Sequence, residues 1–225
     1  MDRVHQLAEE GAPAGTAVLA EAQTGGRGSR GRAWHSPRGG LWLSVLYRPG
    51  SPTGVELLSL RLGLRAAEAL ESVAPGPGVM LKWPNDLIVS DRKLGGILCE
   101  ARWQGASLAW IAAGIGLNVT NPIPDDLRPT ATALGEHVPG ASVDAILPGL
   151  LEALLRPLPE ADRLTPDECR RLERRDWLRG RELRAPLAGR AEGIGPDGAL
   201  LVRVGQELTA ARAGHVELAH GSFTR

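Results

Sequence analysis

The sequence predicts an α+β protein, in which a mixed or antiparallel sheet has helices packed on it and a small all-β unit follows at the C-terminal end. Strand-like runs follow one another over 79–119, after a long amphipathic helix at 55–73. Two further helices are expected behind these strands, at 143–155 and 166–178. Strands and helices that are grouped separately along a chain favour the α+β class.

The N-terminal part is expected to hold a short helix and two strands. Apolar residues at helical spacing predict a helix over 2–10. The runs TAVLAEAQ at 16–23 and LWLSVLYR at 41–48 are rich in residues that favour strands. A loop rich in glycine and arginine separates these two strands at 24–40.

The clearest helix spans 55–73, because its apolar residues share one face as in an amphipathic helix. That face carries Leu58, Leu62, Ala66, Ala69, Leu70 and Val73. The opposite, polar face carries Arg61, Arg65, Glu68 and Ser72. Prolines and glycines at 75–78 end this helix. Strand-like runs then follow at 79–83, 87–89, 94–102 and 108–119.

The sequence pattern changes near Gly180, from that of a helix to that of short strands. Thr165 is the predicted N-cap of the helix that precedes this point. Short alternating runs follow it, linked by a turn at 195–198. They predict an all-β unit of about 45 residues, which is small for independent stability and is expected to pack on the rest of the protein. We therefore divide the chain into a larger domain at 1–178 and a smaller one at 179–225.

Composition excludes several classes of protein. The 225 residues carry 26 basic and 26 acidic side chains, so bulk charge does not indicate a polyanion-binding protein. No apolar run reaches the roughly 18 residues of a membrane-spanning helix, and the N-terminus lacks a signal-peptide core, which favours a cytoplasmic protein without a membrane partner. Cys99 and Cys169 are the only cysteines, and the five histidines show no ligand spacing. Neither a disulfide framework nor a protein-bound metal is therefore expected.

Lysine is rare in this chain. Of the 26 basic residues only Lys82 and Lys93 are lysines, and the other 24 are arginines. An ammonium is a compact point charge, whereas a guanidinium is a broad planar fork. The two lysines are therefore candidates for a site that needs a point charge.

The loop GGRGSRGR at 25–32 is the first candidate site. No acidic residue lies between Glu21 and Glu56, while five arginines do, so the loop carries a local positive field. Backbone N–H groups at glycines can also cradle an anion. The glycine spacing matches a dinucleotide motif, but neither the helix nor the acidic residue which that motif requires follows, so we reject it. For the loop taken alone, a nucleic-acid-binding segment and a solvated surface loop remain open.

The run KWPND at 82–86 is the second candidate. Pro84 cannot donate to a sheet, so the strand must break there. The break would display three polar side chains at a strand end, those of Lys82, Asn85 and Asp86. A simple turn at a sheet edge explains the same residues equally well. The glycines at 114 and 116, inside the last strand of the larger domain, allow a ligand or another backbone to come close.

In combination, these segments resemble the biotin–protein ligases, also called biotin–[acetyl-CoA-carboxylase] ligases. The resemblance rests on four stretches that occur in this order: AEAQTGGRGSRGRAW, GLWLSVLYRP, LKWPNDLIVSDRKLGGILCEAR and AAGIGLNV. The later stretch EGIGPDGALLVRV resembles the small SH3-like end domain of that family. The resemblance implies a class II synthetase-like catalytic domain that binds biotin and ATP at 1–178, and a small SH3-like β-barrel at 179–225.

The resemblance implies a two-step, AMP-forming reaction that uses ATP, with Mg²⁺ bound to the nucleotide, and biotin as the substrate. The carboxylate of biotin attacks the α-phosphate of ATP, and the acyl group then passes to a lysine of a biotin carboxyl carrier protein domain, such as that of acetyl-CoA carboxylase. Neither step needs a nucleophile from the enzyme, and the sequence offers no credible nucleophile–base pair. Cationic groups that bring two anions together are expected to supply most of the rate.

Carried over position by position, the resemblance implies three groups of site residues. The catalytic group is Lys93, Lys82 and Arg27. The biotin-binding group is Gln23, Gly26, Arg27, Gly28, Ser29, Lys93, Gly114 and Gly116. The ATP-binding group is Arg30, Arg32, Trp34, Lys82, Asn85, Asp86 and Asn118. The glycine-rich loop is expected to close over the reactive intermediate and exclude water.

The start of the chain departs from the family pattern. Relatives usually have a strand that ends in Ser-Thr-Asn or a similar triplet, whose hydroxyls help to bind biotin, where this chain reads Met1-Asp2-Arg3. Some relatives also carry an N-terminal DNA-binding helix-turn-helix, for which this chain has no room, so a ligase without a specific nucleic-acid partner is expected. A homodimer is compatible with the resemblance.

Three alternatives remain open at this point. The nearest is a lipoate–protein ligase or a related acyltransferase of the same fold. The second is a nucleic-acid-binding protein that uses the arginine-rich loop, and the third is a non-catalytic scaffold.

Overall fold

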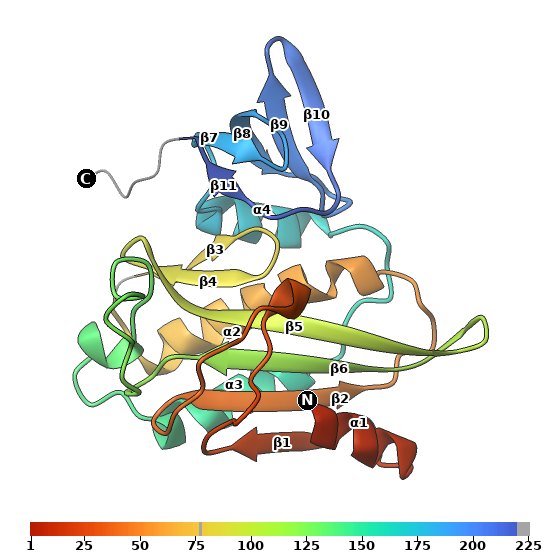
Figure 1. Ribbon diagram of the computed structural model, residues 1–225. Helices are drawn as coiled ribbons and strands as arrows, with labels where there is room; N and C mark the ends of the chain where they lie inside the picture. The colour runs from red at the N-terminus through yellow and green to blue at the C-terminus, as the bar shows by residue number, and fades with distance from the viewer. Residues whose placement is uncertain (77, 220–225) are drawn as a thin grey trace.

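The computed structural model describes residues 1–76 and 78–219 of the chain. It contains two sheets, in which every pairing between strands of the described residues is antiparallel, and four α-helices (Figure 1). The predicted α+β class is confirmed. Pro77 of the predicted helix-ending segment and residues 220–225 of the predicted C-terminal unit lie outside the described residues.

The larger sheet has six strands in the order β1-β2-β6-β5-β4-β3. Its strands are β1 (Ala17–Ala20), β2 (Leu41–Tyr47), β3 (Met80–Lys82), β4 (Asp86–Val89), β5 (Arg92–Gln104) and β6 (Ser107–Leu117). The predicted runs are confirmed in number and order, although β1 is shorter than expected. The long β5–β6 hairpin forms the centre of the sheet, so residues near its glycines are held on a rigid support.

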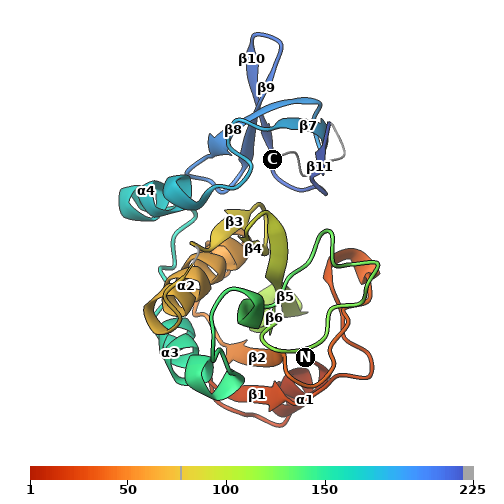
Figure 2. The same cartoon turned by 90° about the vertical axis from the view of Figure 1, so that its left-hand side faces the viewer.

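The helices cover the two faces of this sheet unequally. They are α1 (Asp2–Glu9), α2 (Leu58–Val73), α3 (Val143–Leu155) and α4 (Pro166–Arg175), with a short 3₁₀ turn (Val55–Leu57) ahead of α2. Alternate residues of β2 and β6, such as Leu43 and Ile115, pack with α2 and α3 in the main core. The short α1 packs on the opposite face, against Leu46 and Trp110. Much of that opposite face therefore has no helix on it (Figure 2).

The last helix begins at a local cap and ends where the chain pairs with a distant strand. Thr165 caps α4 as predicted, because its hydroxyl accepts from the N–H of Glu168, whose carboxylate accepts from the N–H of Thr165 in return. The helix ends earlier than the predicted boundary at 178. Trp177 instead donates its backbone N–H to the carbonyl of Leu81, which ties the chain to the edge strand β3.

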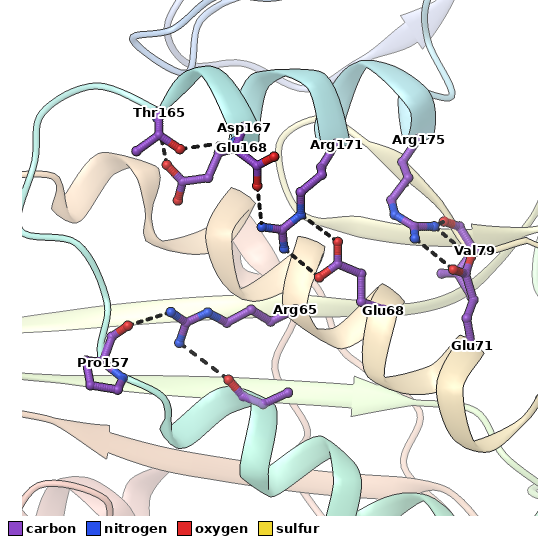
Figure 3. A network of polar contacts seen from close by, with 11 residues as sticks. Arg65, Glu68, Glu71, Val79, Pro157, Thr165, Asp167, Glu168, Arg171 and Arg175 are labelled. Atoms are coloured by element: carbon purple, nitrogen blue, oxygen red, sulfur yellow. Dashed lines mark hydrogen bonds and ion pairs between the residues drawn. The ribbon is translucent and has the colours of Figure 1, made fainter.

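The polar face of α2 lies against α4 (Figure 3). Arg61 is only 3% exposed and is paired with Glu168 at 2.9 Å. On the same face Glu68 is paired with Arg171 at 2.5 Å. The predicted polar face is therefore used for ion pairs with a second helix. Val73, which was placed on the apolar face, is 39% exposed at the end of α2.

The C-terminal sheet has five strands in the order β10-β9-β8-β7-β11. These are β7 (Glu182–Ala185), β8 (Gly189–Ile194), β9 (Leu200–Val204), β10 (Glu207–Ala211) and β11 (Glu217–Leu218). Within the described residues its two edge strands, β10 and β11, do not pair, so the barrel is not closed. The sheet shares an apolar cluster with the β3–β4 end of the larger sheet, and the indole N–H of Trp83 donates to the carbonyl of Gly198 at 2.9 Å. It therefore packs on the larger part as predicted (Figure 1).

Candidate functional site

A cavity of about 660 Å³ lies on the sheet face opposite α2. We call it the larger cavity. Because side chains alternate along a strand, Ser44, Gly114 and Gly116 face this cavity while their neighbours face the core. The glycine/arginine loop, the start of α1, the β4–β5 turn region and the loop at 121–131 form its other walls.

The glycine/arginine loop is folded back on itself beside this cavity. Gly28 donates its backbone N–H to the carbonyl of Arg32 at 2.7 Å, and Trp34 donates to Gly26 at 2.8 Å. A tight turn at Ser29–Gly31 connects the two sides, with φ of 61° at Arg30. The loop therefore stands as a hairpin-like flap at the cavity.

Lys93 is fixed between an acid and an aromatic ring. Its Nζ lies 2.6 Å from Oδ1 of Asp86 and 4.9 Å from the ring centroid of Trp34. Such an ammonium is oriented by both partners, through an ion pair and a cation–π contact. All three residues line the larger cavity. The structure therefore brings together a predicted catalytic residue and two predicted ATP-binding residues.

The two predicted asparagines support the cavity through hydrogen bonds within the protein. Asn85 donates its side-chain N–H to the carbonyl of Ile97 at 2.7 Å, which fixes the start of β4 on β5. Asn118 donates to the carbonyl of Thr132 at 3.1 Å and accepts from Asn121 at 3.1 Å. Asn118 therefore anchors the loop at 121–131, which contributes to the cavity wall.

Arg27 is paired with two acids. Its guanidinium lies 2.7 Å from Asp2 at the start of α1 and 3.5 Å from Glu100 on β5. The hydrogen bond that Arg27 donates to Asp2 raises the pKa of Arg27, and Glu100 adds to this effect. Glu100 is held in turn by His5, at 2.8 Å. The positive charge of Arg27 is thus largely balanced by the protein in this arrangement.

Lys82 lies beside a second, smaller cavity of about 280 Å³. Burial lowers the pKa of Lys82, and its ammonium lies 5.6 Å from the ring centroid of Trp177. The smaller cavity shares part of its lining with the larger one, namely Ser29, Arg32, Asn85, Asp86, Ile97 and Leu98. Arg27 and Lys93 therefore line one cavity and Lys82 lines its neighbour.

Of the predicted site residues, twelve line the larger cavity: Gln23, Arg27, Gly28, Ser29, Arg32, Trp34, Asn85, Asp86, Lys93, Gly114, Gly116 and Asn118. Arg30 and Lys82 line the smaller cavity instead. Gly26 lines neither. A Cβ at Gly26 would overlap the carbonyl oxygen of Trp34, so this glycine serves the close approach of the two sides of the loop.

The space above the two strand glycines is filled by protein side chains. A Cβ at Gly114 would lie 2.6 Å from Sδ of Met1, and one at Gly116 would lie 3.0 Å from Nε1 of Trp34. That indole N–H is buried and has no hydrogen-bond partner in the part of the chain that the structure describes. It is therefore a donor at the cavity for an acceptor from outside the protein.

Sequence reasoning missed two parts of the wall. These are the start of α1, with Met1, Asp2 and Arg3, and the apolar side of the loop at 121–131, with Ile123, Pro124 and Leu127. The family resemblance marks the position of Met1-Asp2-Arg3, but the residues found there do not match its biotin-binding triplet. No motif marks the loop at 121–131, which reaches the cavity only through the tertiary fold.

Two further findings concern the described residues alone. Residues 1–76 and 78–219 contain no group of three or more His, Cys, Asp or Glu side chains that could hold a metal ion. Within the same ranges, no helix is both long enough and apolar enough to cross a bilayer.

Residues 2–118, which include the flap and all of the strands of the larger sheet, match the model of the Biotin/lipoate A/B protein ligase family. The chain belongs to this family. A bifunctional ligase/repressor BirA of Bacillus subtilis is 32% identical to this ligase over 229 residues, which cover 95% of this chain and 69% of the relative. A biotin–[acetyl-CoA-carboxylase] ligase of Paracoccus denitrificans is 32% identical over 209 residues, which cover 83% of each protein.

Solved structures show which members of this biotin/lipoate family the chain resembles. The biotin protein ligase of Aquifex aeolicus, in complex with biotin and ATP, superposes on this ligase with a TM-score of 0.81 at 28% identity, and the match covers 96% of this chain and 94% of that one. The ligase of Leishmania major in complex with biotinyl-5-AMP matches with a TM-score of 0.63 at 25% identity, over 98% of this chain and 94% of that one. The predicted relationship to the biotin protein ligases is confirmed.

Proposed function

We propose that this ligase activates biotin with ATP to give biotinyl-5′-AMP and pyrophosphate, and then transfers the biotinyl group to a lysine of a biotin carboxyl carrier domain. One observation carries the proposal. Lys93, Asp86 and Trp34 meet at a single large cavity, beside a flap that is rich in arginine. This arrangement supplies positive charge and an aromatic surface to a ligand that combines a carboxylate with a nucleotide.

The first step joins two anions that repel each other. A carboxylate oxygen of biotin forms a bond to the α-phosphorus, and the bond from that phosphorus to the bridging oxygen of pyrophosphate breaks. The ammonium of Lys93, oriented by Asp86, would stabilise the carboxylate and the charge that develops at phosphorus. Arg32, which lines both cavities, would bridge the two reactants. Orientation and fixed charge then supply the rate acceleration.

The second step needs no covalent bond to the enzyme. The amine of the acceptor lysine attacks the carbonyl carbon of the mixed anhydride, AMP leaves, and the amide nitrogen loses a proton. The flap would exclude water from the anhydride until the acceptor arrives. Its internal hydrogen bonds, from Gly28 to Arg32 and from Trp34 to Gly26, support a flap that moves as a unit.

The ligand has two chemically different ends. We assign its biotin end to the strand face around Gln23, Gly114 and Gly116, and its adenosine end to Trp34 and the loop anchored by Asn118. The indole N–H of Trp34, which has no hydrogen-bond partner among residues 1–76 and 78–219, supports contact with a polar ligand at this wall. Met1 lies over Gly114, so a ligand that rests on that glycine requires this side chain to shift.

Magnesium would enter with the nucleotide. The described residues offer no cluster of carboxylates for it, and the one acid that lines both cavities, Asp86, is already paired with Lys93. These residues suit a cation held mainly by the phosphates of ATP, which would offset their negative charge.

The remaining assignments concern partners and domains. We assign catalysis to residues 1–178 and an SH3-like unit to residues 179–225. The proposed acceptor is the carrier domain of acetyl-CoA carboxylase. We also propose that the enzyme is cytoplasmic and has no specific nucleic-acid partner. A homodimer would form most simply at β1, which is an edge strand with Leu19 45% exposed. Sedimentation of the protein over a range of concentrations tests this last assignment.

The function is tested by mixing the protein with biotin and Mg-ATP and detecting biotinyl-5′-AMP by mass spectrometry. We expect the adenylate with biotin and not with lipoate, and we expect biotin to appear on an added carrier domain. An adenylate that forms only with lipoate would contradict the proposal. Omission of Mg²⁺ and a heat-denatured sample serve as controls.

A further inference from the structure

A line of polar contacts behind the wall of the larger cavity connects β6, α1, β5 and the flap. The indole Nε1 of Trp110 donates to Nδ1 of His5 at 3.0 Å. Nε2 of His5 lies 2.8 Å from Oε2 of Glu100, and Oε1 of Glu100 lies 3.5 Å from Nε of Arg27. Arg27 lines the larger cavity, whereas the other three residues line neither cavity. The contacts therefore lead from the interior under α1 to a residue of the cavity wall.

The ring of His5 is fixed in one protonation state by its neighbours. An indole N–H can only donate, so Nδ1 of His5 must accept and carries no proton. The proton of the neutral ring is then on Nε2, which donates to Oε2 of Glu100. His5 is 6% exposed and Trp110 is 7% exposed, so water competes little for either bond. His5 therefore orients one oxygen of Glu100 and leaves this carboxylate its full negative charge.

The two acids that pair with Arg27 differ in exposure and in the atoms that they contact. Asp2 contacts Nη1 and Nη2 of Arg27 at 2.9 and 2.7 Å, and the side chain of Asp2 is 82% exposed. Glu100 contacts Nε instead, and its side chain is 23% exposed. Water screens an exposed ion pair, so an anion in the cavity replaces Asp2 more easily than Glu100. The two Nη groups can thus turn to a ligand while Glu100 keeps the guanidinium in place.

We propose that His5 is a positioning residue, which through Glu100 holds Arg27 at the wall of the larger cavity. Arg27 held in this way exchanges Asp2 for the carboxylate of biotin at its two Nη groups. The inference rests on the proposed function, because it takes Arg27 to bind biotin. His5 and Glu100 make no contact with the substrate, since neither lines a cavity. Arg27 also pairs with Ala33 inside the flap, so the same contacts fasten the flap to β5.

Two substitutions of His5 separate its two hydrogen bonds. The amide nitrogen of glutamine reaches the place of Nε2 of histidine, so His5→Gln still donates to Glu100. The amide oxygen of asparagine takes the place of Nδ1, so His5→Asn still accepts from Trp110 but loses the bond to Glu100. Each variant loses one hydrogen bond. A purely structural role of His5 therefore predicts similar effects for both variants.

The test is biotin-dependent ATP–pyrophosphate exchange by the full chain. We expect His5→Asn to raise the KM for biotin about tenfold, as the loss of a hydrogen bond to a charged group would, and to leave the KM for ATP unchanged. His5→Gln should stay close to wild type. Glu100→Gln should raise the KM for biotin at least as much as His5→Asn, because Arg27 loses a charged partner. The matched control is Arg102→Gln, which should behave like wild type, because Arg102 lies 4.0 Å from the same carboxylate and lines neither cavity.

Equal KM values for biotin in the two His5 variants would overturn the proposal. A rise in Arg102→Gln that matches the rise in Glu100→Gln would also overturn it, since general charge would then explain the effect. Circular dichroism checks the fold of each variant. If His5→Asn does not fold, Glu100→Gln decides the question, and a wild-type KM for biotin in that variant would overturn the proposal. In the Glu100→Gln background His5→Asn should add little, and full additivity of the two changes would contradict an action through Glu100.

Limited digestion with trypsin separates this inference from the proposed function. Cleavage after Arg27 requires this side chain to leave its acidic partners, so His5→Asn should speed the cleavage and His5→Gln should not. If wild type forms no biotinyl-5′-AMP while the cleavage differs in this way, the positioning of Arg27 by His5 stands and the proposed function fails. If the adenylate forms and the two variants behave alike in both assays, the function stands and the inference fails.

Discussion

Substitution of Arg61 by methionine removes a charged group from the contact between α2 and α4. The guanidinium donates through Nε to Glu168 at 2.9 Å. It also donates to the carbonyl groups of Pro159, Ala161 and Arg163, at 2.9, 3.1 and 3.0 Å. Methionine has a similar length and no donor, so the variant leaves one carboxylate and three carbonyl groups without this partner.

The expected loss of stability follows from burial of the pair. Arg61 is 3% exposed, and the side chain of Glu168 is 12% exposed. Removal of one partner of a buried ion pair costs roughly 3–5 kcal/mol, because the other charge stays buried and uncompensated. Equilibrium unfolding in urea, followed by tryptophan fluorescence, should show a midpoint that is lower by on the order of 1–2 M.

The pH dependence gives this prediction a second signature. Burial by itself raises the pKa of Glu168, but the backbone N–H of Thr165 and the guanidinium of Arg61 outweigh it, so the pKa lies below its ordinary value of 4.5. A depressed pKa in the folded state stabilises the protein above the unfolded pKa, and this stabilisation is lost as the pH falls through the folded pKa. The difference between wild type and Arg61→Met should therefore shrink below about pH 4.5.

The control removes an exposed ion pair instead. Arg156 is paired with Glu152 at 2.8 Å, and the two side chains are 65% and 72% exposed. Arg156→Met should cost less than about 1 kcal/mol, because water screens such a pair. Equal midpoints for the two variants, or a difference from wild type that does not change with pH, would refute the reasoning about Arg61.

Four further predictions address the site and its support. Lys93→Ala and Lys93→Arg should each lower biotin-dependent ATP–pyrophosphate exchange by about a hundredfold, because the point charge beside the carboxylate of biotin is lost or displaced. Near-normal exchange in either variant would contradict this role of Lys93. Gly26→Ala should speed the release of biotinyl-5′-AMP, measured by filtration, because a Cβ there meets the carbonyl of Trp34 and opens the flap; unchanged release would argue against a closing flap. Trp83→Phe should lower the free energy of unfolding by about 1 kcal/mol in thermal melts, since one hydrogen bond to the C-terminal sheet is lost, and an unchanged melting temperature would count against this contact. Cys99 is half-buried at the smaller cavity, and burial raises the pKa of its thiol to about 11, so it should react slowly with N-ethylmaleimide at pH 8 until the protein unfolds. Rapid labelling in peptide maps would contradict the raised pKa.

Local patterns in the sequence predicted most of the elements. Three examples are helix α2, the β5–β6 hairpin and the cap at Thr165. Each depends on residues that are close together in the chain. Their periodicity and capping chemistry are therefore visible without a structure. The flap and the KWPND run were also recognisable, because glycine, proline and lysine stand there in an unusual combination.

Contacts between distant segments were not predictable in the same way. Arg61 has the spacing of an exposed residue, yet α4, which lies more than 100 residues later in the chain, covers it. Lys82 and Lys93 are 11 residues apart, but β3 and β5 present them to different cavities. The start of α1 and the loop at 121–131 line the larger cavity without any motif of their own.

The sequence by itself determined the family, the order of the strands and helices, and the chemical types that gather at the site, because these depend on local spacing and on residue identity. Only the tertiary structure decided which charges are balanced within the protein and which face an open cavity. Arg27 is paired with Asp2 and Glu100, whereas Arg30, Arg32 and Lys82 surround the smaller cavity without an acid partner among the described residues. The physical reason is that the electrostatic energy of a charged group depends on its neighbours in space and on its access to water, and folding sets both.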